Sequence, residues 1–168
     1  ADLSQWAVRY AEEHFKIPVF NGTLSEARFE DRSFDVVVMN DVIEHLERPQ
    51  ETLREIRRIL KNDGVLYLST PDMGSIWSRL LGARWWGVNK YHLVYFSKET
   101  LEKMLHTVGF KSLRYSSYPR SFSCRYWAKR LETYPAIFSK TFVVFSRILG
   151  LENKQLTIDL HDQLDVIV

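Results

Sequence analysis

Three side chains that can bind metal ions or protons stand close together after an apolar run. Asp41, Glu44 and His45 occupy positions i, i+3 and i+4, and the apolar run from Val36 to Met39 precedes them. On a helix this spacing places all three side chains on one side. Two carboxylates with an imidazole suit Mg²⁺ or a harder transition metal ion. Histidine can also act as a general base near neutral pH.

A structural interpretation of the same residues stays open. Asn40 or Asp41 can cap a short helix, and the early acids then meet its positive end. In that case His45 is a packing or pocket residue. The spacing alone does not choose between the two interpretations.

The apolar run is the clearest of several expected elements. Residues 34–39 have the continuous hydrophobicity of a buried strand in a parallel sheet. Polar groups at the carboxyl end of such a strand lie where open α/β sheets bind ligands. The other expected elements are, in order, a helix at 4–15, a short strand at 19–20, a short helix at 41–46, a helix at 49–60, a turn at 61–64, a strand at 65–70, a helix at 97–108 and a strand at 110–118.

Strands and helices alternate along most of the chain, which predicts an α/β domain with a mostly parallel sheet covered by helices. We expect a single domain, with a core at 1–118, a helical insertion at 119–155 and a terminal strand region at 156–168. The long connection at 71–96 is either a substrate wall or a packed lid. Its tryptophans are Trp77, Trp85 and Trp86.

The composition is that of an ordinary globular protein. The chain has 168 residues, of which 45% are apolar and 26% charged, with a net charge of +2. Cys124 is the single cysteine, so we expect no internal disulfide and a reducing, cytoplasmic location. No apolar window is long enough for a transmembrane helix.

Positive charge and aromatic residues gather in the last third of the chain. Residues 111–154 hold nine cations and two acids, with aromatic residues between them. This mixture suits peripheral contact with an anionic membrane through 119–150, or a site for an acidic or lipid-linked substrate. A helical cap with its aromatics in the core is the plainer alternative. Nucleic acid is the less favoured partner, since no recognised binding motif accompanies the charge.

Several motifs together resemble the class I S-adenosylmethionine-dependent methyltransferases, and in particular the small-molecule type that includes the ubiquinone-pathway O-methyltransferases. The resemblance extends over about residues 1–118 and continues weakly to the end. The motifs that carry it are Asp2-Leu-Ser4, Gly22-Thr-Leu24, Phe34-Asp-Val-Val-Val-Met-Asn-Asp-Val-Ile-Glu-His-Leu46, Glu55-Ile-Arg-Arg-Ile-Leu-Lys61, Gly64 and Leu68-Ser-Thr-Pro71.

The resemblance implies a set of cofactor-binding residues. Asp2 corresponds to the acid that binds the ribose hydroxyls, a role that suits a carboxylate because it accepts two hydrogen bonds. Thr23 and Leu24 correspond to the pair that borders the adenine. Asn40 and Asp41 correspond to residues beside the methionine part of S-adenosylmethionine.

The family's first strand and its glycine-rich turn precede the residue that corresponds to Asp2, and this sequence contains neither. The implied fold is therefore a Rossmann-like, doubly wound sheet whose first strand is missing, with weakened cofactor binding. Because an open sheet edge invites pairing, we expect a partner chain, such as a second copy, or a local rearrangement to fill the space.

The resemblance also implies roles for the polar cluster. Some relatives bind a divalent metal through an acid, an x-x-Glu-His motif and a distant histidine; here these would be Asp41, Glu44, His45 and His92. His45 and His92 are also candidate general bases for a hydroxyl acceptor, and Glu44 would face the acceptor together with them. We expect methyl transfer to a small-molecule acceptor, with oxygen as the favoured atom. The rival is a non-catalytic module that binds an anionic membrane or an acidic partner.

Overall fold

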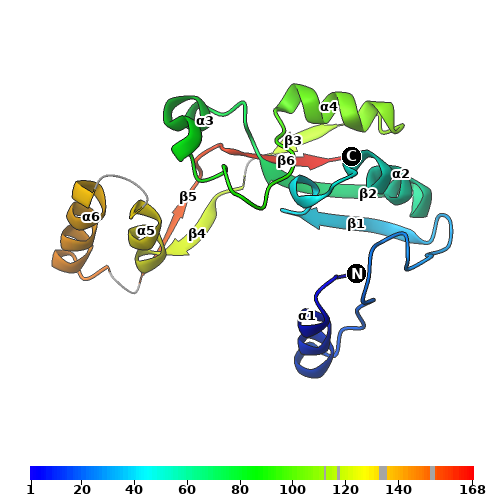
Figure 1. Ribbon diagram of the computed structural model, residues 1–168, viewed down its shortest axis with the longest axis horizontal. Helices are drawn as coiled ribbons and strands as arrows, with labels where there is room; N and C mark the ends of the chain where they lie inside the picture. Colours follow the sequence, from blue (N-terminus) through cyan, green and yellow to red (C-terminus); the bar gives the residue numbers. More distant parts are fainter. Residues whose placement is uncertain (112, 117, 133–135, 152–153) are drawn as a thin grey trace.

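The computed structural model describes residues 1–168 except 112, 117, 133–135 and 152–153 (Figure 1). In chain order its elements are α1 (Gln5–Tyr10), a π-helical turn (Ala11–Phe15), β1 (Phe34–Asn40), a 3-10 turn (Ile43–His45), α2 (Pro49–Ile59), β2 (Leu60–Pro71), α3 (Ile76–Leu81), a 3-10 turn (Gly82–Arg84), α4 (Lys98–Thr107), β3 (Arg114–Ser116), β4 (Arg120–Ser123), α5 (Cys124–Leu131), α6 (Ala136–Ile148), β5 (Gln155–Ile158) and β6 (Gln163–Ile167).

The main sheet has four strands in the order β1-β2-β6-β3. Strands β1 and β2 are parallel, whereas β6 is antiparallel to both β2 and β3. Three of the four strands therefore run in the same direction, as a mostly parallel α/β sheet requires. A separate two-stranded sheet pairs β4 with β5, and these two strands lead to α5 and α6 at one end of the molecule (Figure 1).

One face of the main sheet forms the hydrophobic core. Met39 of β1 pairs with Leu68 of β2, and Leu68 pairs in turn with Val166 of β6. These three side chains are buried together with residues of α2 and α4, which supply Leu53, Ile56, Leu101 and Leu105. Helix α2 begins with Pro49 in its first turn, and α4 begins with a capping box at Ser97. Both helices lie where the sequence predicts them.

Strand β1 is present as expected, but its expected place inside the sheet is wrong. It forms the edge of the sheet, and Val36 and Val38 are 55% and 61% exposed. The cause is that, within the described residues, β1 pairs with β2 alone, and that α2 and α4 pack on the other face. That a partner chain or a rearrangement covers this edge stays a prediction.

The N-terminal segment forms less sheet than expected. The helix after Ser4 is confirmed, with the Ser4 hydroxyl accepting from the Ala7 amide at 3.3 Å. The short strand expected at 19–20 is wrong, because only an isolated parallel bridge joins Asp2 to Asn21. A strand needs a continuous neighbour to supply its backbone hydrogen bonds, and here the contact is limited to one residue pair.

Three further segments differ from the expected boundaries. The turn expected at 61–64 is a bulge within β2, where two steps along β1 are matched by five along β2. The strand expected at 110–118 is reduced to β3, and residues 112 and 117 of that prediction lie outside the described residues. The last third contains the expected helices α5 and α6, and β5 and β6 lie in the expected terminal strand region. Strand β4 and its pairing with β5 were not predicted, because β4 is only four residues long.

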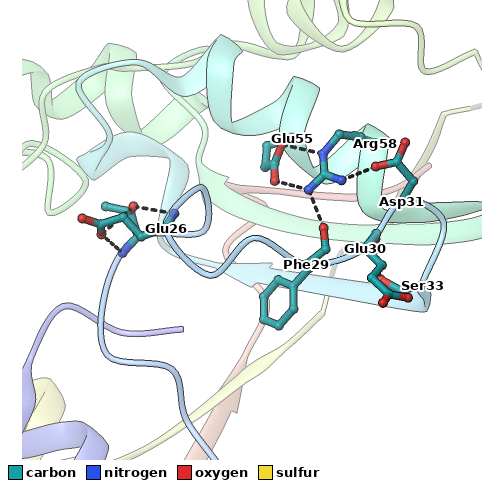
Figure 2. A network of polar contacts seen from close by, with 8 residues as sticks. Glu26, Phe29, Glu30, Asp31, Ser33, Glu55 and Arg58 are labelled. Carbon is teal, nitrogen blue, oxygen red and sulfur yellow. Dashed lines mark hydrogen bonds and ion pairs between the residues drawn. The ribbon is translucent and has the colours of Figure 1, made fainter.

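An arginine on α2 holds the loop that leads into β1 (Figure 2). Arg58 donates to the Glu55 carboxylate at 2.9 Å, to the Phe29 carbonyl at 2.7 Å and to Asp31. Glu55 and then Asp31 raise the pKa of the Arg58 guanidinium above its ordinary value. The network fixes the loop against α2 and so helps to set where β1 starts.

Replacing Leu68 by alanine should lower the free energy of unfolding by about 2–5 kcal/mol, because it opens a cavity in the core. Val38→Ala should lower the free energy of unfolding by less than ~1 kcal/mol, since the Val38 side chain lies on the face of the sheet that α2 and α4 do not cover. Urea denaturation of both variants measures the difference. If both variants lost the same free energy of unfolding, the hydrophobic core would not be confined to one face of the sheet. A partner that covers β1 would explain that result.

Candidate functional site

A cavity of about 370 Å³ lies beyond the carboxyl ends of β1 and β2. Asp41, which follows β1, and Pro71, which ends β2, both line it. The opposite wall comes from β4, α5 and the segment between β5 and β6. This is the edge at which open α/β sheets bind ligands.

Two segments distant in sequence meet at the cavity. The backbone carbonyl of Glu44 accepts hydrogen bonds from the amides of Leu93 and Val94, at 2.8 and 3.1 Å. This double contact holds the loop that carries His92 against the 3-10 turn that carries His45. The two imidazole rings lie 4.7 Å apart in an edge-to-face arrangement.

The hydrogen bonds of His45 determine which of its nitrogens is available. Its Nδ1 lies 2.9 Å from the Tyr91 carbonyl oxygen. A carbonyl can only accept, so Nδ1 carries the hydrogen in this contact. In the neutral ring Nε2 then keeps its lone pair, which is the form that can take a proton or bind a metal.

Glu44 is a buried carboxylate with one satisfied oxygen. Its exposed fraction is 2%, and its Oε2 accepts from the Thr70 hydroxyl at 2.9 Å. The other oxygen, Oε1, is buried without a hydrogen-bond partner, and so is Nδ1 of His92. Buried polar atoms without partners are uncommon in proteins, and these two atoms are both available to accept a hydrogen bond or to bind a metal ion. Both residues line the cavity.

The structure brings together three of the four residues expected to bind a metal. Ligand atoms of Glu44, His45 and His92 all lie within 4.8 Å of one another. Asp41 does not belong to this group, so the expectation of a shared helix face is wrong for it. The 3-10 turn begins only at Ile43, and Asp41 has a positive φ of 48°, which breaks the helical spacing.

Asp41 instead contacts Arg120, a residue that the sequence did not single out. The Arg120 guanidinium lies 3.4 Å from Asp41 Oδ2 and donates to the Ser69 hydroxyl at 3.0 Å. Arg120 therefore joins β4 to the ends of β1 and β2, across the cavity. In the sequence it is one of nine cations in a basic region, and nothing in the pattern distinguishes it.

Aromatic side chains form the outer wall of the cavity. Phe122 stacks on Tyr126 with ring centres 4.3 Å apart, and Trp127 meets Phe122 edge-on at 5.7 Å. The Trp127 indole nitrogen is buried without a partner. Trp86 lines the cavity and donates to Asp162, whereas Trp85 is buried. The tryptophan-rich connection thus serves both as cavity wall and as packing.

The residues expected to border the nucleoside end of the cofactor, Asp2, Thr23 and Leu24, lie on the N-terminal segment. The Gly22 amide donates to the Asp2 carbonyl at 3.1 Å, which places Asp2 beside the start of the Thr23-Leu24 pair. Asp2 Oδ1 accepts from the Ser4 amide at 2.7 Å. Thr23 pairs with Glu26, which is labelled in Figure 2. These residues do not line the cavity described above.

Comparison with known proteins identifies the family. Residues 1–115 match the sequence profile of the methyltransferase domain family, so the chain belongs to that family. The chain is 30% identical over 110 residues to a probable S-adenosylmethionine-dependent methyltransferase of Mycobacterium tuberculosis; the match covers 65% of this chain and 39% of the relative. It is 27% identical to the malonyl-[acyl-carrier protein] O-methyltransferase of Halalkalibacterium halodurans, over 79% of this chain and 63% of the relative.

The chain spans less than two thirds of the length of these two relatives. Its fold is similar to the crystal structure of an S-adenosylmethionine-dependent methyltransferase from Archaeoglobus fulgidus, with a TM-score of 0.62 and 17% identity. That match covers 98% of this chain and 72% of the other. The expected α/β, Rossmann-like class is therefore confirmed.

Tyr67 on β2 provides a pH-dependent test of the region beside the cavity. Burial, together with the 2.8 Å hydrogen bond to Asp165, raises the pKa of Tyr67 to about 12. An unfolded tyrosine has a pKa of about 10. The folded state therefore favours the neutral phenol. The stabilisation that the neutral Tyr67 phenol provides is complete below pH ~10 and is lost as the pH rises towards ~12.

We expect the free energy of unfolding to fall less steeply between pH 8 and about 11.5 in Tyr67→Phe than in the unsubstituted protein. Urea denaturation at several pH values measures both slopes. At pH 8 the variant should be the less stable protein, because Asp165 then loses a hydrogen bond. Identical slopes would show that Tyr67 is not protected in solution.

Proposed function

We propose that this chain supports S-adenosylmethionine-dependent methyl transfer to a hydroxyl group of a small molecule held in the cavity. The observation that carries the proposal is the convergence of Glu44, His45 and His92 on one cavity at the carboxyl edge of the sheet. Family membership supports the reaction class, and the relatives named above are S-adenosylmethionine-dependent or O-methyltransferases.

The cofactor would supply an electrophilic methyl group on a positively charged sulfur. Asp2 would hold its ribose hydroxyls, Thr23 and Leu24 would border its adenine, and Asn40 and Asp41 would lie beside its methionine part. The chemistry of Asp2 and Asp41 fits these roles, because a carboxylate accepts hydrogen bonds from the ribose hydroxyls and from the ammonium group of the methionine part. The Asp2 side chain is exposed, and Asp2 forms a parallel β-bridge with Asn21. Both features support the assignment of Asp2 to the ribose hydroxyls.

The cluster beside the cavity would prepare the acceptor. A hydroxyl oxygen becomes a stronger nucleophile when a base takes its proton as the new carbon–oxygen bond forms. His45, with Nδ1 donating to the Tyr91 carbonyl, presents Nε2 as that base, and His92 is the second candidate. The buried Glu44 carboxylate would stabilise the imidazolium that results. The aromatic wall would orient the acceptor and exclude water.

The test uses labelled methyl transfer from S-adenosylmethionine to a panel of phenols, catechols and carboxylic acids. With the best hydroxyl acceptor, the double variant His45→Phe/His92→Phe should lower kcat by about 10²–10⁴-fold, as loss of a general base does. Calorimetric affinity for S-adenosylhomocysteine, titrated to millimolar concentration, should stay unchanged. Asp2→Asn should show the opposite pattern, with weaker binding of S-adenosylhomocysteine.

The matched control is His14→Phe, because His14 lies on the N-terminal π-helical turn and does not line the cavity. It should leave both measurements unchanged. Absence of any heat with S-adenosylhomocysteine would overturn the cofactor assignment. If methyl transfer occurred only to carboxylic acids, and if the histidine substitutions did not change its rate, both the hydroxyl acceptor and the histidine base would be wrong.

A divalent metal ion is the second candidate for the same cluster. The unpartnered Glu44 Oε1 and His92 Nδ1, with ligand atoms of all three residues within 4.8 Å, favour it. Glu44, His45 and His92 would hold the ion. A bound ion would lower the pKa of an acceptor hydroxyl and so replace the base.

For this candidate, Mn²⁺ at tenfold its Kd should raise Tm by about 3 °C, because a ligand that binds only the folded state stabilises it. Glu44→Gln should abolish the rise, whereas Asp41→Asn should keep it, since Asp41 lies outside the group. Differential scanning fluorimetry measures all three proteins. No rise at millimolar Mn²⁺ or Mg²⁺ would eliminate the metal and leave the histidine base.

A further inference from the structure

Helix α6 carries an apolar stripe on its outer side. Ile137, Val144, Phe145 and Ile148 are between 56% and 75% exposed. Counted from Ile137, the others stand at i+7, i+8 and i+11, so the four side chains share one face of the helix. Exposed apolar patches of this kind on a helix mark sites of interaction with another apolar surface.

An apolar groove between α5 and α6 opens onto this stripe. Its lining residues are Leu131, Ile137, Thr141, Phe142 and Phe145. The inner side of α6 faces the rest of the protein, where Ser146 is buried. Ile137 and Phe145 border the groove as well as the stripe, whereas Val144 and Ile148 lie outside the groove and remain exposed.

The charges on the two helices are all of one sign. Helices α5 and α6 contain five cations and no acid, and Glu132 follows α5. At 100° per residue, Lys140 and Arg147 lie along one border of the apolar stripe. Lysine and arginine can extend their charged ends from such a border while their aliphatic stems stay on the apolar surface.

The position and length of α6 limit what can cover it. Figure 1 shows α6 at the end of the molecule, remote from the four-stranded sheet. It has 13 residues, which corresponds to about 20 Å of helix, shorter than the ~30 Å hydrocarbon core of a bilayer. Among the described residues no helix is long and apolar enough to cross a membrane. The helix can therefore lie along an apolar boundary but cannot span one.

We propose that α6 docks on the surface of an anionic lipid bilayer, with its apolar stripe at the headgroup–acyl boundary and its cations at the lipid phosphates. Charge complementarity favours this occupant. A second copy of the chain on the same face would bring the α6 cations of both copies, Lys140 and Arg147, together, and like charges at an interface oppose association. An apolar face bordered by cations is the pattern of interfacial helices.

Three aromatic residues of this region lie at the cavity and not on the stripe. Phe122, Tyr126 and Trp127 line the cavity, so they are not the membrane-facing residues. The stripe on α6 is aliphatic apart from Phe145. Membrane docking therefore does not compete with the proposed function for the same side chains, and either one can fail without the other.

The test is flotation of the protein with vesicles of phosphatidylcholine alone or mixed equally with phosphatidylglycerol. We expect flotation with the anionic vesicles, and a decrease when NaCl is raised from 0.1 to about 0.5 M. Val144→Ser/Ile148→Ser should lower the partition coefficient ~10-fold or more, because two apolar side chains leave the bilayer. Lys140→Glu should lower binding to anionic vesicles only.

The matched control is Ile76→Ser/Leu80→Ser on α3, where the same chemical change is made at side chains that are 66% and 70% exposed. This control should float like the unsubstituted protein, and circular dichroism should show that all variants stay folded. Protein that remains at the bottom with anionic vesicles overturns the proposal. So does a dimer in sedimentation analysis that Val144→Ser/Ile148→Ser dissociates, because a second copy would then cover the stripe.

Discussion

The candidate site depends on one backbone contact, the acceptance of two amide hydrogen bonds by the Glu44 carbonyl. The amides belong to Leu93 and Val94, which lie almost fifty residues further along the chain. Because both donors are held by one oxygen, the loop that carries His92 has little freedom relative to the turn that carries His45. The relative position of His45 and His92 therefore depends on a main-chain interaction. A substitution at either histidine that leaves the backbone unchanged would keep this interaction.

A second link joins the cavity to the region beyond the core. Arg120 reaches from β4 to Asp41 and to Ser69, at the ends of β1 and β2. The outer aromatic wall is then carried by α5, which continues from β4. The sheet edge supplies the polar groups, whereas the β4–α5 segment supplies the shape of the cavity. If the proposed function holds, acceptor selectivity would depend on β4 and α5, and the polar cluster would stay the same.

Two of the exposed apolar surfaces in the described part of the chain have different physical origins. Val36 and Val38 are exposed because β1 has a strand on only one side and no α2 or α4 on that face. The stripe on α6 lies on a helix whose other side already packs against the protein. The first surface is an open sheet edge with unused backbone hydrogen bonds. The second needs only an apolar boundary, and its cations favour an anionic one.

The sequence by itself determined the family and many of the local elements, because the apolar run before Asn40, Pro49 in the first turn of α2, the capping box of α4 and the motifs up to Pro71 act over short distances along the chain. It also predicted Glu44, His45 and His92 as candidate site residues, and the structure brings these three side chains together. Only the tertiary structure decided that Asp41 leaves this cluster for Arg120, that β1 is an edge strand and that Phe122 and Trp127 face a cavity. These features depend on contacts between segments far apart in the chain, and periodicity and spacing contain no information about such contacts.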